Sequence, residues 1–246
     1  MIEAFELTKS FGSARAVCGV SFACDDGHIT GLLGPNGAGK TTTLRILSTV
    51  LAPDAGTATV DGHDIVAAPR RVRQALGILP DSPGLYGRLT AREHLRYFGR
   101  LHGLDGSVLE SRVREVVELL RMEEYADRRC GGFSKGMQQK VALGRALIHG
   151  PRTIILDEPT AGLDVMSIRE TRETLRHFKT EGRCILFSSH NIPEVEELCD
   201  RIVILAGGQV HGVGSPGELK EKTRCSRLED AFVELVGTAA GLYDHP

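Results

Sequence analysis

The sequence predicts an α/β fold whose core is a mainly parallel sheet, and three observations support this. The apolar run 29–33 leads into a glycine-rich loop and then into a stretch with apolar residues at helical spacing. Three later apolar or β-branched runs, 153–156, 184–189 and 202–205, are separated by helix-like segments, as expected for strands buried on both faces. The length of 246 residues allows one large α/β domain or a core domain with a subdomain.

The N-terminal region predicts a small antiparallel β subdomain. Residues 2–7 and 16–22 form short apolar or alternating runs that are broken by glycines, and residues 53–56, Pro-Asp-Ala-Gly, signal a turn before a strand at 57–60. These strands flank the glycine-rich loop in the sequence.

The middle of the chain predicts a mainly helical subdomain, residues 90–147, inserted in the α/β core. Here the apolar period changes to 3.6, with Val113, Val116, Val117 and Leu120 on one face. After the last core strand, the Gly207-Gly208 pair predicts a hairpin. The spacing of apolar residues over 228–235 predicts a final short helix.

Composition and charge restrict the classes of function. Thirty Lys and Arg residues against 32 Asp and Glu residues give a net charge of −2, which provides no net attraction to nucleic acid, so no nucleic-acid partner is expected. No apolar run reaches the ~18 residues of a membrane span, and the N-terminus lacks a signal-peptide pattern, so a cytoplasmic location is expected. The six cysteines include no C-x-x-C pair, which favours reduced buried thiols over disulfides or a zinc site.

Residues 34–42 form the most informative motif, since they match G-x-x-x-x-G-K-[ST] between a predicted strand and a predicted helix, 40–50. Backbone N–H groups of such a loop and of the helix N-terminus surround phosphates. Lys40 is expected to reach the β- and γ-phosphates, Thr41 to ligate Mg²⁺, and Thr42 to bond a phosphate. The alternative is a plain glycine-rich turn, which the complete strand, motif and helix disfavour. The expected nucleotide contacts are Gly34, Pro35, Asn36, Gly37, Ala38, Gly39, Lys40, Thr41 and Thr42.

A second chemical signal is the pair of carboxylates that ends the run 153–156. Asp157 is placed to hold Mg²⁺, directly or through water, and Glu158 to orient and deprotonate an attacking water. Two acids before Pro159 could instead form a solvated turn. The phosphate loop earlier in the chain favours the functional interpretation, a Walker B strand.

Taken in order, these motifs resemble the nucleotide-binding subunits of ABC transporters. Residues 160–164, Thr-Ala-Gly-Leu-Asp, match the D-loop of that family, residues 188–190, Ser-Ser-His, match its switch histidine, and residues 133–140, Phe-Ser-Lys-Gly-Met-Gln-Gln-Lys, match its LSGGQ region. The resemblance covers nearly the whole chain. It implies a P-loop NTPase (RecA-like) core, with residues 1–246 as one ATPase domain.

The resemblance also assigns further residues to the site. Ser134 and Gly136 would bind the γ-phosphate of a nucleotide held by a second ATPase subunit, so that each chain supplies half of each site. His190 would hydrogen-bond the γ-phosphate, although a histidine at a strand end is more often a satisfied polar residue. Phe11 would stack on adenine, and its alternative is packing in the core.

Two motifs depart from the family pattern. The signature has Lys135 and Met137 where the family has glycine and glutamine, and Asp81 stands where the family usually has a glutamine that senses Mg²⁺. Asp81 can still ligate the metal or its water, or it can cap the turn 80–83. With residues 84–93, both departures resemble the ATPases of ABC-2-type exporters, including sodium-extrusion subunits.

The resemblance therefore implies an ATPase that binds ATP and Mg²⁺ and drives a separate transmembrane permease. It would work as a homodimer or with a close paralogue, on the inner face of the cell membrane. The alternative is a soluble ABC ATPase that is not coupled to transport, but those usually carry two cassettes or a long coiled coil. A P-loop small-molecule kinase would have no use for residues 133–139 or for Glu158.

Overall fold

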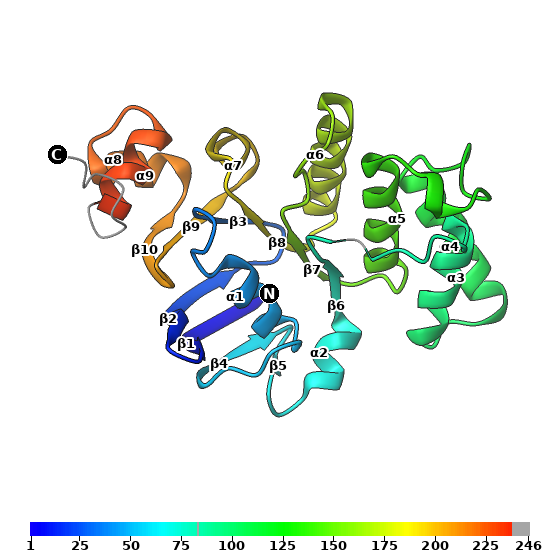
Figure 1. The fold of residues 1–246 in the computed structure, drawn as a ribbon, viewed down its shortest axis with the longest axis horizontal. Coiled ribbons are helices and arrows are strands. Elements are labelled where there is room, and N and C mark those ends of the chain that lie inside the picture. The colour runs from blue at the N-terminus through cyan, green and yellow to red at the C-terminus, as the bar shows by residue number, and fades with distance from the viewer. Residues whose placement is uncertain (83, 238–246) are drawn as a thin grey trace.

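The computed structural model describes residues 1–82 and 84–237 and contains two sheets, one of four and one of six strands (Figure 1). The strands are β1 Ile2–Phe11, β2 Ala14–Cys24, β3 Ile29–Leu33, β4 Ala55–Val60, β5 His63–Asp64, β6 Leu76–Leu79, β7 Thr153–Asp157, β8 Cys184–Ser189, β9 Arg201–Ala206 and β10 Gln209–Gly214. The helices are α1 Lys40–Leu47, α2 Pro69–Ala75, α3 Ala91–Leu101, α4 Gly106–Leu119, the 3₁₀ helix η1 Cys130–Gly132, α5 Lys135–Leu147, α6 Val165–Thr180, α7 Ile192–Leu198, α8 Pro216–Thr223 and α9 Leu228–Val236.

The six-stranded sheet has the order β10-β9-β3-β8-β7-β6, and all of its neighbours are parallel except β10 and β9. These two strands form the hairpin predicted at Gly207 and Gly208, whose φ angles are 55° and 77°. The four-stranded sheet, in the order β2-β1-β4-β5, is antiparallel throughout. The predicted α/β class, with a mainly parallel sheet and an N-terminal antiparallel sheet, is confirmed.

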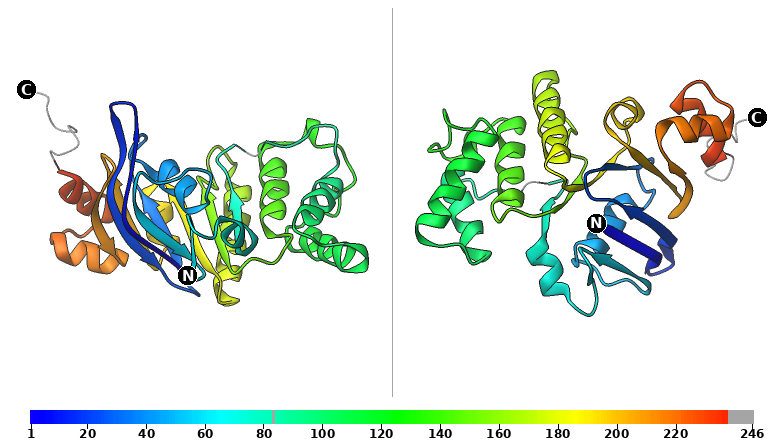
Figure 2. Two further views of the ribbon diagram at one scale, coloured as in Figure 1. Left: turned by 90° about the horizontal axis from the view of Figure 1, so that it is seen from below. Right: turned by 180° about the vertical axis from the view of Figure 1, so that it is seen from behind.

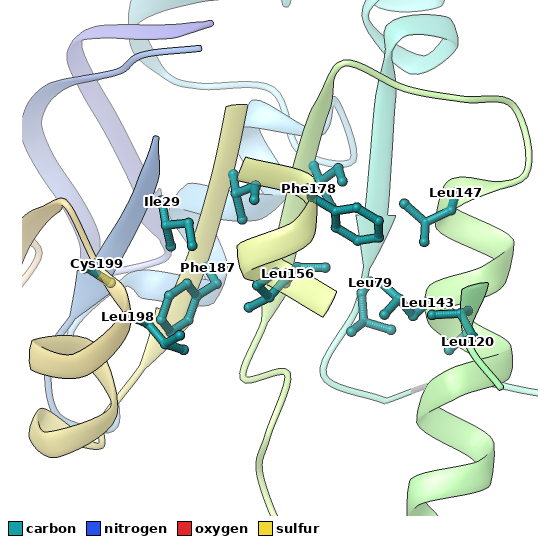
Figure 3. Packing of buried hydrophobic residues seen from close by; sticks show 14 of the residues in the cluster. Ile29, Leu79, Leu120, Leu143, Leu147, Leu156, Phe178, Phe187, Leu198 and Cys199 are labelled. Carbon is teal, nitrogen blue, oxygen red and sulfur yellow. The ribbon is translucent and has the colours of Figure 1, made fainter. Parts of the chain in front are cut away.

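The core lies on both faces of the parallel sheet because successive residues of a strand point to opposite faces. In β7, Ile154 and Leu156 belong to one buried cluster and Ile155 to the other. The first cluster includes Leu156 and Phe178, which Figure 3 shows, and packs against the helices. The second cluster joins the sheet to α1 and to the N-terminal sheet. Burial on both faces explains why β3, β7 and β8 are buried along their whole length.

The segment between β6 and β7 contains α3, α4, η1 and α5, which lie at the opposite end of the molecule from α8 and α9 (Figure 2). Thr90 starts α3 with a capping box: its hydroxyl accepts from Glu93 N and the Glu93 carboxylate accepts from Thr90 N. Gly99 and Gly144 allow close packing within this segment, since a Cβ at either would lie within 3 Å of a leucine side chain. No described helix is both long and apolar enough to cross a membrane.

One sequence prediction about the phosphate-loop helix is wrong in its extent. The helix α1 ends at Leu47 instead of continuing to residue 50, and the Val50 side chain is 67% exposed. Thr49 has a φ of 60°, and the N–H groups of Val50 and Leu51 both bond the Arg45 carbonyl, so the chain turns away from the helix axis. The helical spacing of Val50 is therefore coincidental. All six cysteines are free, as expected.

Candidate active site

The phosphate loop lies between β3 and α1 and is held in place by close backbone contacts. Gly39, at the N-cap of α1, has a φ of 99°, and a Cβ there would lie 2.3 Å from the Ala16 carbonyl oxygen. A Cβ at Gly34 would lie 2.1 Å from the Leu205 carbonyl oxygen. The loop is also bonded to the β9–β10 hairpin, since Gly208 N donates to Ala38 O at 3.1 Å. These glycines are required because no other residue leaves room for the loop.

The Lys40 side chain is buried beneath this loop and is only 6% exposed. Its Nζ donates to the carbonyl oxygens of Gly34 at 2.6 Å and Pro35 at 3.2 Å, and it lies 3.4 Å from Glu158 Oε1. A buried ammonium must be paired or hydrogen-bonded, and these three oxygens stabilise it.

Asp157, at the end of β7, lies next to Thr41 at the start of α1. The Thr41 hydroxyl donates to Asp157 Oδ1 at 3.2 Å, and the Ser188 hydroxyl donates to the same oxygen at 2.6 Å. Asp157 is 6% exposed and has no cationic partner among the described residues. A buried carboxylate beside a hydroxyl is a set of hard oxygen donors, which suits Mg²⁺. Two of the three residues predicted from the sequence as metal ligands, Thr41 and Asp157, therefore lie together, whereas no hydrogen bond joins Asp81 to either of them among the described residues.

Glu158 follows in a strained conformation, with a φ of 48° that non-glycine residues seldom adopt. Its N–H donates to Ser188 Oγ at 2.9 Å, and its Oε2 lies 3.0 Å from His190 Nδ1. The Glu158 carboxylate is 15% exposed and the His190 ring 56%. The turn directs the carboxylate between Lys40 and His190, which are distant in the sequence.

Ser188 is the functional residue that sequence reasoning did not identify. It is fully buried at the end of β8, and its hydroxyl bridges the Asp157 carboxylate and the Glu158 backbone. The sequence does contain an indication of this role, because two serines end an otherwise apolar strand. A buried hydroxyl in such a place needs hydrogen-bond partners. The sequence predicts a role in this segment for His190 alone.

Of the residues described above, Lys40, Thr41, Glu158 and His190 line one cleft of about 460 Å³. Phe11 stands at its edge with 51% exposure, so the alternative that Phe11 packs in the core is wrong. The Lys9 ammonium lies 5.9 Å from the centre of that ring. The residues that line the cleft are Phe11, Ala16, Pro35, Asn36, Gly37, Ala38, Gly39, Lys40, Thr41, Thr42, Asp81, Glu158, Ala161 and His190.

Four sequence-predicted site residues do not line this cleft. Gly34 and Asp157 directly precede lining residues in the sequence, whereas Ser134 and Gly136 lie at the start of α5. Ser134 is the N-cap of α5, and its hydroxyl accepts from Met137 N at 3.3 Å. Gly136 packs beside Ser167 and Asp164 at the start of α6. Within one chain, neither residue lines the cleft that contains the phosphate loop.

Comparison with known proteins decides the family. Residues 17–161 match the family model described as ABC transporter. The chain belongs to the ABC transporter family. The resemblance drawn from the motifs is thus confirmed, as is the assignment of the chain as an ATPase of the P-loop NTPase fold.

Individual members of the ABC transporter family are similar over most of this chain. The ABC transporter ATP-binding protein NatA of Bacillus subtilis (strain 168) is 46% identical over 89% of this chain and 89% of its own length. The Nod factor export ATP-binding protein I of Burkholderia lata is 38% identical over 93% of this chain and 74% of its own length. A solved ATP-binding subunit of an ABC transporter superposes with a TM-score of 0.88 at 31% identity, over 96% of this chain and all of the other.

Proposed function

We propose that this chain is the ATP-binding and hydrolysing subunit of an ABC-2-type exporter. It would work on the cytoplasmic face of the membrane as a pair of ATPase subunits with a separate transmembrane permease. The names of the similar proteins, which are called ATP-binding proteins, support a separate permease. The name of the Burkholderia relative, which refers to export, supports the direction.

The observation that carries the proposal is the position of the Glu158 carboxylate in the cleft. It lies within 3.4 Å of Lys40 Nζ and 3.0 Å of His190 Nδ1, next to the Thr41 and Asp157 pair. Lys40 and the loop N–H groups supply positive charge for phosphates, and a carboxylate at the same place can accept a proton from water. Mg²⁺, held by Thr41 and Asp157, would neutralise phosphate charge.

The separation of Ser134 and Gly136 from the cleft supports a shared site. These residues begin α5 with backbone N–H groups that suit an anion, yet they line no wall of the phosphate-loop cleft. A second copy of the chain, or a close paralogue, would place them opposite the first copy's phosphate loop. Each ATP would then be held between two subunits.

The alternative function is a soluble ABC ATPase that is not coupled to transport. A pull-down from detergent-solubilised membranes of the native organism, with the tagged chain as bait, distinguishes the two functions. The proposal expects co-purification of a polytopic membrane protein that stimulates ATP hydrolysis, and vesicle assays with sodium and drug-like cations would then test the cargo. The Glu158→Gln variant serves as the control, because it should capture the same membrane protein without hydrolysis. Recovery of the chain from the soluble fraction alone would support the alternative.

A further inference from the structure

A second, smaller cleft of about 270 Å³ adjoins the nucleotide cleft, the one that contains the phosphate loop, and is lined by two of the residues that depart from the family pattern. Asp81 comes from the loop after β6 and Lys135 from the first position of α5. Asp81 also lines the nucleotide cleft, so its carboxylate belongs to the walls of both cavities. The other residues that line the smaller cleft are Gln138, Gln139, Ala161, Gly162 and Leu163.

Both charged side chains lack a partner. Among residues 1–82 and 84–237, neither Asp81 nor Lys135 has an ion pair within 4.0 Å or a side-chain hydrogen bond, whereas Lys140, also in α5, pairs with Glu170 at 2.9 Å. The Asp81 carboxylate and the Lys135 ammonium therefore belong to residues that line the same cleft, and no other described side chain pairs with either charge. Each lowers the electrostatic free energy of the other.

The position of Lys135 in its helix is unfavourable without such a partner. The N-terminus of a helix carries a partial positive charge, which destabilises a cation in the first turn. Lys135 occupies the first residue of α5, and that turn contains no acidic residue. A carboxylate across the cleft offsets this repulsion.

Gly162 provides room for the lysine. Its φ is +69°, and a Cβ built there would lie 2.8 Å from Lys135 Nζ and 3.7 Å from its Cδ. The lysine stem therefore runs along the segment 161–163 and lines the cleft, although the side chain as a whole is exposed. A side chain at residue 162 would occupy the space that the ammonium uses.

We propose that Lys135 and Asp81 are electrostatic partners across this cleft, and that Lys135 is a positioning residue that attracts the start of α5 to the loop after β6. Because Asp81 also faces the nucleotide cleft, Lys135 and a nucleotide-bound metal compete for the same carboxylate. This second part rests on the proposed function, whereas the pairing itself does not.

The pairing is tested without nucleotide or metal, by a double-mutant cycle of Asp81→Asn and Lys135→Met with urea unfolding. At low salt we expect the two effects to be non-additive by about 1.5- to 5-fold in the unfolding equilibrium constant, the range of exposed ion pairs. In 1 M NaCl the coupling should disappear, because the Debye length falls to about 3 Å. Asp105→Asn, which lies at the start of α4, is the matched control and should be additive with Lys135→Met. Additive effects of Asp81 and Lys135 at low salt would overturn the pairing.

Exchanging the charges gives an independent check. Asp81→Lys alone and Lys135→Asp alone each place like charges across the cleft and should destabilise the chain, whereas the double exchange should recover stability. An aspartate at residue 135 is also stabilised by the partial positive charge of the helix N-terminus. The effect of Lys135→Asp on stability in the Asp81→Asn background measures this helix contribution alone. A double exchange no more stable than the sum of these terms contradicts the pairing.

Competition with the nucleotide is tested by calorimetry with Mg²⁺ and a non-hydrolysable ATP analogue. If Lys135 holds Asp81 away from the metal, Lys135→Met should tighten binding by the same 1.5- to 5-fold factor. The substitution removes an interaction that stabilises only the unbound state, so the free energy of binding becomes more favourable by the same amount. In the Asp81→Asn background, Lys135→Met should leave affinity unchanged. Unchanged affinity in the native background, together with a positive stability cycle, would overturn the competition and confine Lys135 to a structural pairing.

Discussion

The Nδ1 atom of His190 lies 3.0 Å from Oε2 of Glu158, whose other oxygen lies 3.4 Å from Nζ of Lys40. One carboxylate therefore contacts both the loop lysine and the histidine that follows β8. Phosphate oxygens compete with Glu158 for the Lys40 charge, so nucleotide binding should change the surroundings of the carboxylate. This contact chain connects the phosphate loop to the end of β8.

We expect Glu158→Gln to retain ATP binding and to lose hydrolysis by about 10²–10⁴-fold, because an amide bonds water but cannot accept its proton. With turnover blocked, the variant should dimerise in ATP and Mg²⁺, since a ligand held between subunits shifts the equilibrium by mass action. Sedimentation and a phosphate-release assay measure both effects. Normal turnover, or a monomer at saturating ATP even with the membrane subunits present, would contradict the shared-site proposal.

The variant Lys40→Ala should abolish nucleotide binding and should also lower stability. The lysine donates to two loop carbonyls and pairs with Glu158, so its removal leaves buried oxygens without a partner. Each such oxygen should lower the free energy of unfolding by about 1–3 kcal/mol. Lys40→Arg keeps the charge and serves as the control, with partial binding. Calorimetry and chemical unfolding measure the two effects, and unchanged ATP affinity in Lys40→Ala would refute the site.

Ser188→Ala should reduce both stability and turnover. It removes the hydroxyl that bridges Asp157 and the Glu158 backbone, and an unsatisfied buried group costs about 1–3 kcal/mol. The neighbouring Ser189→Ala is a matched control, because Ser189 is equally buried but bonds Glu194 at 2.9 Å. Both variants should be destabilised, and only Ser188→Ala should lose kcat. Equal kcat in the two variants would show that Ser188 is merely structural.

For Asp81, the expected effect of Asp81→Ala is uncoupling. The loop, Thr41 and Asp157 remain, so ATP affinity should change little, while stimulation of hydrolysis by the membrane partner should fall. Asp81→Gln keeps an oxygen ligand and should retain more coupling. The turn-cap alternative predicts lower stability with normal transport by the folded fraction. Thermal melting together with transport assays separates the two interpretations.

The sequence could predict the phosphate loop, the acidic pair and the parallel sheet because each depends on local residue order. The full burial of β7, for example, follows directly from its apolar run. Contacts between distant segments could not be predicted in the same way. The Lys40 contact with Glu158 joins residues 118 positions apart, and the Ser188 bridge depends on the pairing of β7 with β8. The end of α1 at Leu47 depends on a left-handed turn at Thr49, which the spacing of apolar residues does not predict.

The final prediction concerns pH and a stacked pair of histidines at the ends of α3 and α5, of which His149 is half-buried and His102 exposed. The His102 and His149 rings are stacked with centroids 3.7 Å apart, and neither His149 ring nitrogen has a hydrogen-bond partner among the described residues. Burial, with smaller contributions from His102 and Arg112, lowers the pKa of His149 to about 4. Burial also lowers the pKa of His102. Both rings are therefore neutral in the folded chain at neutral pH.

In the unfolded chain a histidine has a pKa of about 6.5, so below that pH the unfolded state binds more protons than the folded state. Stability should be full above pH 6.5, fall as the pH is lowered toward 4, and lose roughly 2–3 kcal/mol from His149. His149→Phe keeps a stacked ring that cannot be protonated, so its unfolding free energy should decline less over this range. Urea unfolding at pH 7.5, 6 and 5 compares the two proteins. A parallel decline in both, or an NMR titration that places the His149 pKa near 6.5, would show that this pair does not set the acid sensitivity.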